Sequence, residues 1–164
     1  MFGLFEPKDK SLICSPVTGT VHPLCECRDA AFSGGALGEG VIFRFDGDYI
    51  VAPCSGKVGS VAKTNHCVSI FCDNGAELLI HCGFDTMMLK PNGLRILVSK
   101  NQRVRQGQKL IEIDREVLKG KDVDLTTPMV IMNADDVNFE IICTSGEVKA
   151  KKTAIMRCQP KEEV

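Results

Sequence analysis

The fold is decided by residues 64–86, which read TNHCVSIFCDNGAELLIHCGFDT. Two β-like runs flank the turn at residues 73–76 (DNGA), and Asn-Gly between apolar runs is a strong hairpin signal. In an antiparallel hairpin, the start of the first strand lies beside the end of the second. The segment therefore predicts that His66 and His81, two of only three histidines in the chain, are neighbours. Adjacent imidazoles are suited to phosphoryl relay or to metal binding.

The rest of the chain predicts more strands of the same kind, because short apolar runs alternate with Gly, Pro, Asn and Asp. The single segment that looks helical runs from Asp114, a good N-cap, to Gly120 at its end. The sequence therefore predicts an all-β fold, an antiparallel sandwich or flattened barrel with one short helix. The expected strands are 12–14, 19–21, 41–45, 49–52, 57–62, 68–72, 77–81, 94–98, 109–113, 129–132, 139–142 and 154–157.

A weak internal repeat supports this fold. Residues 15–21 (SPVTGTV) and 52–58 (APCSGKV) share a small residue, a proline, a hydroxyl residue, a glycine and a valine at matching positions. Proline removes a ladder donor and glycine permits a tight bend, so each copy predicts a strand-turn-strand corner. Residues 102–110 and 144–148 resemble a related unit. Such corners recur in sandwiches that carry biotinyl or lipoyl groups and in some zinc peptidases, so they indicate fold and not function.

The composition is that of an ordinary globular protein. The chain has 164 residues, 44% of them apolar and 25% charged, with a net charge of −1, which gives no field toward nucleic acid or anionic membrane. Apolar runs are too short to span a bilayer, and the N-terminus lacks the features of a secretory signal, so we expect a cytoplasmic protein. The expected organisation is a loose segment at 1–10, one domain at 11–158 and a loose tail at 159–164.

The nine cysteines are scattered and odd in number. In a chain without a signal peptide, this pattern predicts reduced thiols and no disulfide framework. Cys25 and Cys27 are too close together for the usual zinc spacing, and no second pair follows them. We expect the cysteines in strand-like runs to be small buried apolar residues: Cys67, Cys72, Cys82 and Cys143.

An ordered set of motifs resembles the glucose-type enzyme IIA family of the bacterial phosphoenolpyruvate-dependent sugar phosphotransferase system. The resemblance extends from about Ile13 to about Arg157, nearly the whole chain. Any one motif would be weak, but their order and approximate spacing are those of the family. The matching segments are 29–33, 52–56, 64–66, 79–86, Asp114 with its short helix, and 127–131.

The resemblance implies a phosphotransferase component with a β-sandwich of the barrel-sandwich hybrid type. His81 would be the phosphorylated histidine, reacting through Nε2 to give a tele-phosphohistidine. It would receive the phosphoryl group from the carrier HPr and pass it to a cysteine on the IIB domain of a permease for glucose or a related sugar. His66 would support the transfer, and Thr64 would orient His66.

Chemistry around the histidines predicts further roles. Backbone N–H groups after the second histidine, at Gly83 and Asp85, would bind the phosphoryl oxygens. Asp29 and Asp85 would face cationic side chains of the partners and steer their approach. An apolar docking patch is expected from Phe32, Leu37 and Leu79.

Several alternatives remain open from the sequence. The histidines, Thr64 and the docking residues all have structural explanations, as buried core or turn residues. A regulatory protein that reports sugar flux by binding partners would use the same face. A zinc hydrolase would need a third ligand and a base, and no H-x-H pair exists. No cofactor is expected for the relay, although His66, His81 and a partner's carboxylate would suit a shared zinc ion in a complex.

The expected partners follow from these hypotheses. HPr and a IIB domain are expected as separate chains, because the sequence begins at its own Met and contains no IIB or IIC segment. Nucleic acid and direct membrane insertion are not expected. Transfer through a shallow exposed face is compatible with a monomer.

Overall fold

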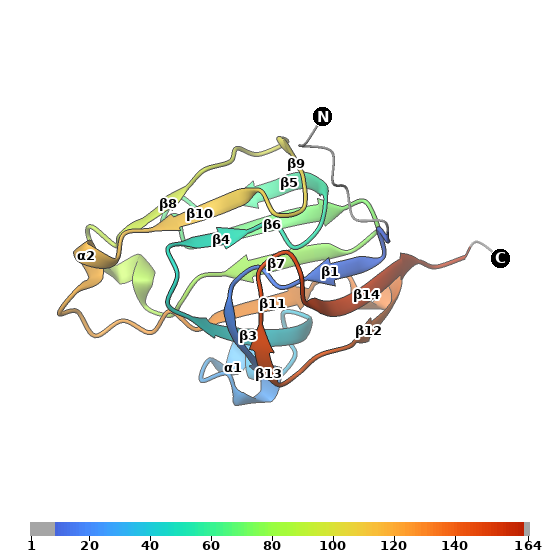
Figure 1. The fold of residues 1–164 in the computed structure, drawn as a ribbon, viewed down its shortest axis with the longest axis horizontal. Helices are drawn as coiled ribbons and strands as arrows, with labels where there is room; N and C mark the ends of the chain where they lie inside the picture. The colour runs from blue at the N-terminus through green and yellow to red at the C-terminus, as the bar shows by residue number, and fades with distance from the viewer. Residues whose placement is uncertain (1–8, 163–164) are drawn as a thin grey trace.

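Antiparallel strands dominate the computed structural model, which describes residues 9–162 (Figure 1). Two four-residue helices, α1 (Ala30–Ser33) and α2 (Arg115–Leu118), and three single turns of 3₁₀-helix, η1 (Leu24–Glu26), η2 (Thr86–Met88) and η3 (Ala134–Asp136), connect them. The strands are β1 (Leu12–Cys14), β2 (Gly19–Pro23), β3 (Glu39–Phe45), β4 (Tyr49–Val51), β5 (Gly56–Val61), β6 (Cys67–Cys72), β7 (Glu77–His81), β8 (Leu94–Ile96), β9 (Arg103–Val104), β10 (Lys109–Ile113), β11 (Thr127–Ile131), β12 (Val137–Ile141), β13 (Gly146–Val148) and β14 (Ala154–Pro160).

The strands form three sheets. The largest has eight strands in the order β13-β2-β3-β11-β7-β6-β5-β9, and the two others are β4-β10-β8 and β1-β14-β12. Figure 1 shows β4 and β10 in front of β5 and β6, so the β4-β10-β8 sheet covers part of the eight-stranded sheet. The paired strands of the described chain run antiparallel, which confirms the predicted all-β antiparallel fold.

The β6–β7 hairpin has the predicted turn and register. Cys67 lies opposite His81, so His66 immediately precedes the first strand while His81 ends the second. The Asn74 side chain accepts a hydrogen bond from the Ala76 N–H at 3.1 Å. Gly75 has a φ of 94°, which glycine adopts without steric cost. Turn chemistry and strand pattern thus agree on one register.

Side-chain alternation on β7 divides the core in two. Leu78 and Ile80 are fully buried in the main hydrophobic cluster between the sheets. The intervening residue, Leu79, packs against a second, smaller cluster on the other face, made of Cys27, Phe32, Ile42, Phe84 and Val130. His81 continues this second face, so the histidine is carried on a strand that is fixed by the core on its opposite side.

The structure contains the predicted helix and also a short helix and two short strands that were not predicted. The helix predicted at Asp114 is present as α2, and the Asp114 carboxylate caps it through the Glu116 and Val117 N–H groups. The helix α1 was not predicted, because four residues carry no periodic signal. The short strands β9 and β13 were also missed.

The loose C-terminal tail predicted from residue 159 is wrong at its start. β14 continues to Pro160, and its last two residues pair with β12, Gln159 with Asn138 and Pro160 with Val137. At the other end, the Lys10 carbonyl accepts a hydrogen bond from the Asn74 amide at 3.1 Å, so this residue is tied to the hairpin turn. Within the two segments, residues 1–8 and 163–164 lie outside the described residues.

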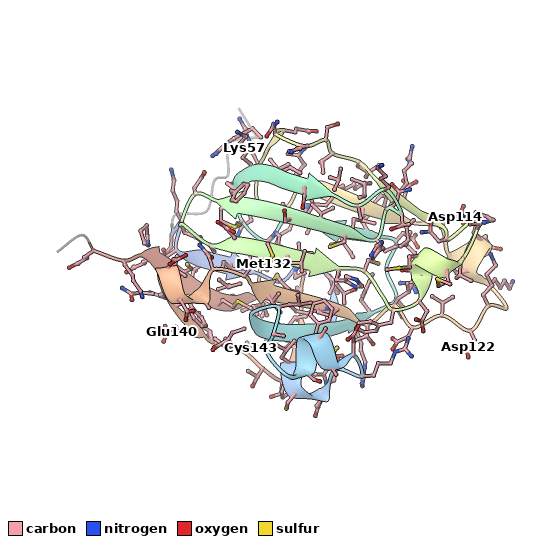
Figure 2. All side chains as sticks on the ribbon, turned by 180° about the vertical axis from the view of Figure 1, so that it is seen from behind. Lys57, Asp114, Asp122, Met132, Glu140 and Cys143 are labelled. Carbon is pink, nitrogen blue, oxygen red and sulfur yellow. A yellow bond between two sulfur atoms is a disulfide. The ribbon has the colours of Figure 1, made fainter. Side chains whose placement is uncertain are left out.

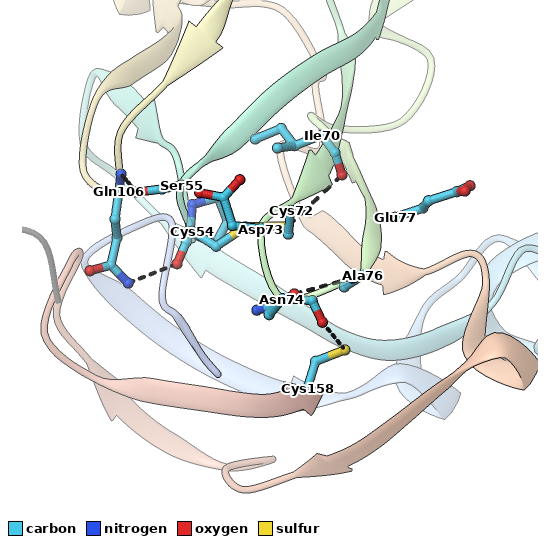
Figure 3. Close-up of a disulfide and its surroundings, with 12 residues drawn as sticks. Cys54, Ser55, Ile70, Cys72, Asp73, Asn74, Ala76, Glu77, Gln106 and Cys158 are labelled. Carbon is cyan, nitrogen blue, oxygen red and sulfur yellow. Dashed lines mark hydrogen bonds between the residues drawn. A yellow bond between two sulfur atoms is a disulfide. The ribbon is translucent and has the colours of Figure 1, made fainter. Parts of the chain in front are cut away.

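A disulfide joins Cys54 to Cys72, contrary to the expectation of reduced thiols throughout (Figure 3). It links the corner before β5 to the end of β6, with the two Cα atoms 6.2 Å apart, within the usual range for a disulfide. The two side chains meet because the Asp73 N–H donates to the Ser55 carbonyl at 3.0 Å and Gly56 pairs with Cys72 across the strands. The sequence held no spacing signal for this pair. The other described cysteines are free: Cys14, Cys25, Cys27, Cys67, Cys82, Cys143 and Cys158.

Reduction of this disulfide should destabilise the fold. The bond closes a loop between positions 18 apart, and a loop of this size gives about 3 kcal/mol in the chain-entropy account. We expect a lower midpoint in thermal unfolding with dithiothreitol than without it, and the same shift in the double variant Cys54→Ala/Cys72→Ala. The exposed, free Cys25 provides the control, since Cys25→Ala should leave the midpoint unchanged. Titration of nine reactive thiols in the denatured, unreduced chain would show that the bond is absent.

Candidate functional site

The two predicted histidines are in direct contact. Their ring centroids are 4.8 Å apart and the ring planes cross at 82°, an edge-to-face arrangement. The Cys82 N–H donates to the His66 carbonyl at 2.6 Å, so the ladder of the hairpin extends one bond beyond the strands and fixes both backbones. His66 is buried, with 7% of its surface exposed. The predicted juxtaposition of His66 and His81 is confirmed.

Thr64 holds the ring of His66. Its hydroxyl lies 2.5 Å from Nδ1 of His66, and the left-handed Asn65 between them (φ 61°) turns the chain so that they meet. The Asn92 amide donates to the Thr64 carbonyl at 2.6 Å and supports this turn from outside. When the Thr64 hydroxyl donates to Nδ1, the proton of the neutral His66 ring lies on Nε2, where it is available to a phosphoryl oxygen.

Two phenylalanines enclose the ring of His81. The Phe32 ring meets it edge-on at a centroid distance of 5.2 Å, and the Phe84 ring stacks on it at 5.8 Å with 27° between the planes. The Nδ1 atom of His81 is buried and has no hydrogen-bond partner within the described residues. An incoming group can therefore reach the ring only through Nε2.

Both imidazoles are shifted toward the neutral form. Burial lowers the pKa of His66. For His81, burial is the largest cause that lowers the pKa, and the neighbouring His66 charge lowers it further. The Gly83 backbone, which makes no hydrogen bond of normal geometry with Nδ1, and Asp29 oppose this shift more weakly. A neutral ring retains the lone pair that nucleophilic attack requires.

The loop after His81 does not offer the amide donors that were predicted. The Cys82 N–H donates to His66, the Gly83 N–H to the Thr126 carbonyl at 3.2 Å, and the Phe84 N–H to the Asp124 carbonyl at 2.9 Å. The prediction for Gly83 is therefore wrong. Its φ of 78° and its lack of a side chain serve the close approach of Asp124, whose carbonyl oxygen would lie 2.7 Å from an added Cβ. The predicted role of the Asp85 backbone is unaffected and stays a prediction.

The predicted docking residues differ in exposure. Phe32 is only 2% exposed because it is the buried residue of α1 and packs against the histidine and the smaller cluster, so its placement in an exposed patch is wrong. Leu37 is 39% exposed and Leu79 is half-buried. The Asp29 carboxylate accepts from the Ala31 N–H at 2.9 Å and caps α1, whereas Asp85 is exposed.

Two exposed methionines follow the His81 loop in the chain. Met87 and Met88 are 46% and 78% exposed and form η2, directly after the loop that follows His81. Seen from behind (Figure 2), this yellow-green turn lies near Asp114. Flexible thioether side chains adapt to differently shaped partners, which suits exposed residues next to the site.

The cysteines beside the histidines are not nucleophiles. Burial raises the pKa of the Cys82 thiol to about 12 and that of Cys67 to about 11. Both thiols are therefore protonated near neutral pH, and the thiolate is the reactive form. Their positions in the hairpin agree with the predicted packing role.

Three residues near the site were not identified as functional candidates from the sequence: Arg28, Phe84 and Asp124. Arg28 pairs with Asp85, which lies 57 positions away in the chain, and also with Asp124. No spacing rule connects such distant residues. Phe84 lay within a quoted motif, but its stacking on the histidine required the fold.

Residues 9–162 contain no group of three or more His, Cys, Asp and Glu side chains that could hold a metal ion. A zinc hydrolase would need three protein ligands from one chain, whereas this site brings together two histidines. In the same part of the chain, the helices are all too short to cross a membrane.

A β-sandwich that presents two contacting histidines of lowered pKa on one face is the architecture of a class of phosphocarrier proteins. A family model described as the phosphoenolpyruvate-dependent sugar phosphotransferase system, EIIA 1, matches residues 11–137. The chain belongs to this family of EIIA components, as its sequence motifs suggested.

Individual relatives agree with the family assignment. The glucose-specific EIIA component of Haemophilus influenzae is 34% identical over 157 residues, covering 95% of this chain and 94% of that protein. The beta-glucoside-specific EIIBCA component of Bacillus subtilis is 32% identical over 89% of this chain, which spans only 24% of its length. Among solved structures, glucose permease IIA from Mycoplasma capricolum matches with a TM-score of 0.78 and 31% identity, covering 88% of this chain and 94% of that one.

The pKa shifts predict a titration of the two rings below the ordinary imidazole value of 6.5. In ¹⁵N-resolved NMR of the imidazoles, we expect His66 and His81 to become protonated only below this pH, and His66→Gln to raise the pKa of His81. Because the unfolded chain binds these protons more readily, the free energy of unfolding should fall as the pH drops below about 6.5. A His81 ring that titrates above 6.5 would contradict the role of burial.

Proposed function

We propose that this protein carries a phosphoryl group on Nε2 of His81, received from a phosphorylated HPr-type carrier and passed to a cysteine on a IIB domain of a sugar permease. The observation that carries the proposal is the environment of His81, a neutral ring whose Nδ1 is buried and whose edge meets His66. Membership of the EIIA family supports the same role.

The site supports an in-line transfer between two nitrogens. The lone pair of His81 Nε2 attacks phosphorus, the P–N bond of the donor breaks, and its electron pair leaves with the donor's nitrogen. Before the attack, the neutral ring carries its proton on Nδ1, which leaves the lone pair on Nε2 free. Once Nε2 bears the phosphoryl group and Nδ1 keeps its proton, the ring carries a positive charge, which the negative phosphoryl oxygens offset. His66 donates from Nε2 to a phosphoryl oxygen and stabilises charge as it develops. The surrounding phenylalanines exclude water and strengthen this interaction.

The proposed partners rest on chemistry and on relatives. Relatives named EIIBCA or EIICBA carry the IIA component together with IIB, which supports a IIB domain as the acceptor. Their names include glucose, mannose, N-acetylglucosamine and beta-glucosides, so we infer glucose or a related sugar as the transported substrate. The transfer needs no cofactor, and a zinc ion would require a partner's carboxylate beside His66 and His81. We place the protein in the cytoplasm as one domain over residues 11–160.

The acceptor is tested by intact mass spectrometry with phosphoenolpyruvate, enzyme I and HPr. We expect one acid-labile phosphoryl group on the wild type and none on His81→Ala. His66→Ala should still accept the group but fail to pass it on, because the developing charge loses its donor. The third histidine supplies a matched control, since His22→Ala should behave as the wild type. Phosphoryl acceptance by His81→Ala would overturn the assignment.

The orienting role of Thr64 is tested with an isosteric change. Thr64→Val removes one hydrogen bond to His66, worth about 1 kcal/mol, and should slow transfer to the IIB domain about 5- to 10-fold. Thr64→Ser keeps the hydroxyl and should remain close to wild type. Rapid-quench measurement of phosphoryl loss from the labelled protein gives the rates. Equal rates for the valine and serine variants would remove Thr64 from the mechanism.

A further inference from the structure

A single arginine connects three separate segments beside the histidine pair. Arg28 lies between η1 and α1, and its terminal nitrogen is 3.0 Å from the Asp85 carboxylate. Its Nε is 3.1 Å from the Asp124 carboxylate, in the segment before β11. Its guanidinium carbon also lies 5.2 Å from the centroid of the Phe84 ring.

These contacts lead directly to His81. The Phe84 ring contacts the guanidinium and also stacks on the imidazole. A planar guanidinium can pair with carboxylates and lie over an aromatic ring at the same time, which the ammonium of lysine does less well. Arg28 therefore fixes the aromatic ring that sets the plane of the histidine.

The loop held by Arg28 has an unfavourable backbone. Asp85 has a φ of 61°, a conformation that non-glycine residues adopt only when surrounding contacts hold it. Without Arg28, the carboxylates of Asp85 and Asp124 would lack their shared counter-ion and repel each other. Arg28 thus stabilises the loop by charge as well as by contact.

We propose that Arg28 is a positioning residue for phosphoryl transfer, which holds Phe84 and the loop after His81 so that Nε2 of His81 faces the donor. This inference rests on the proposed function, because it takes His81 as the acceptor. A misplacement of a reacting atom by a fraction of an ångström lowers the rate of reaction more than the affinity for the partner.

The effect on folding should be small, which makes the proposal testable. The side chains of Arg28, Asp85 and Asp124 are 52%, 80% and 37% exposed, and exposed ion pairs contribute little to stability. We therefore expect Arg28→Gln to unfold within a few degrees of the wild type while accepting phosphoryl groups about tenfold more slowly.

The experiment compares Arg28→Gln, Arg28→Lys and Arg157→Gln. Arg157 is a matched control, since it is 47% exposed and lies near two carboxylates from other segments, Asp9 before β1 and Glu140 on β12. The readouts are kcat and KM for phospho-HPr and the ring-proton chemical shifts of His81, which report the position of the Phe84 ring. We expect Arg28→Gln to lower kcat and move the His81 shifts, Arg28→Lys to recover part of kcat, and Arg157→Gln to change neither.

Two results would overturn the proposal. One is a wild-type kcat in Arg28→Gln, with or without a change in KM, which would leave at most a docking role. The other is unchanged His81 shifts in Arg28→Gln, which would show that the loop does not depend on Arg28. Failure of the wild type to be phosphorylated on His81 would instead refute the proposed function, and the shifts would still decide whether Arg28 positions the ring.

Discussion

The site depends on the antiparallel pairing of β6 with β7. This pairing places Cys67 opposite His81. One additional backbone hydrogen bond, from the Cys82 N–H to the His66 carbonyl, extends the pairing of the two chain segments beyond the strand ends. A slip of one residue would turn His81 into the main core and expose Ile80, so the burial of Leu78 and Ile80 holds the register. The placement of the two imidazoles is therefore maintained by apolar packing on the opposite face of β7.

Burial gives the histidines a second property besides their position. An exposed imidazole would be partly protonated near neutral pH, whereas Phe32 and Phe84 keep the ring of His81 in a medium that disfavours charge. The same enclosure covers Nδ1 and leaves Nε2 as the nitrogen that an incoming group can reach. One set of contacts thus affects both the charge of the ring and the access to its nitrogens.

Local sequence patterns were enough for the fold and for the centre of the site. The DNGA turn and the alternation in β7 specify a hairpin, and the hairpin specifies the contact of His66 with His81. The contacts around the two histidines could not be predicted from local sequence patterns. Phe32 was expected on the surface, because nothing local reveals that α1 turns this side chain toward the smaller cluster. The Cys54–Cys72 bond and the ion pairs of Arg28 join residues that only the complete sandwich brings together.

The first three amide groups of the loop after His81, those of Cys82, Gly83 and Phe84, donate to carbonyl groups of the protein itself, those of His66, Thr126 and Asp124. A cradle of free N–H groups would bind a phosphoryl group firmly and deepen the energy well of the loaded state. With these three N–H groups already bonded, the loop has fewer donors to offer. A carried phosphoryl group would therefore be held less firmly, and the free-energy drop to the next acceptor would be larger.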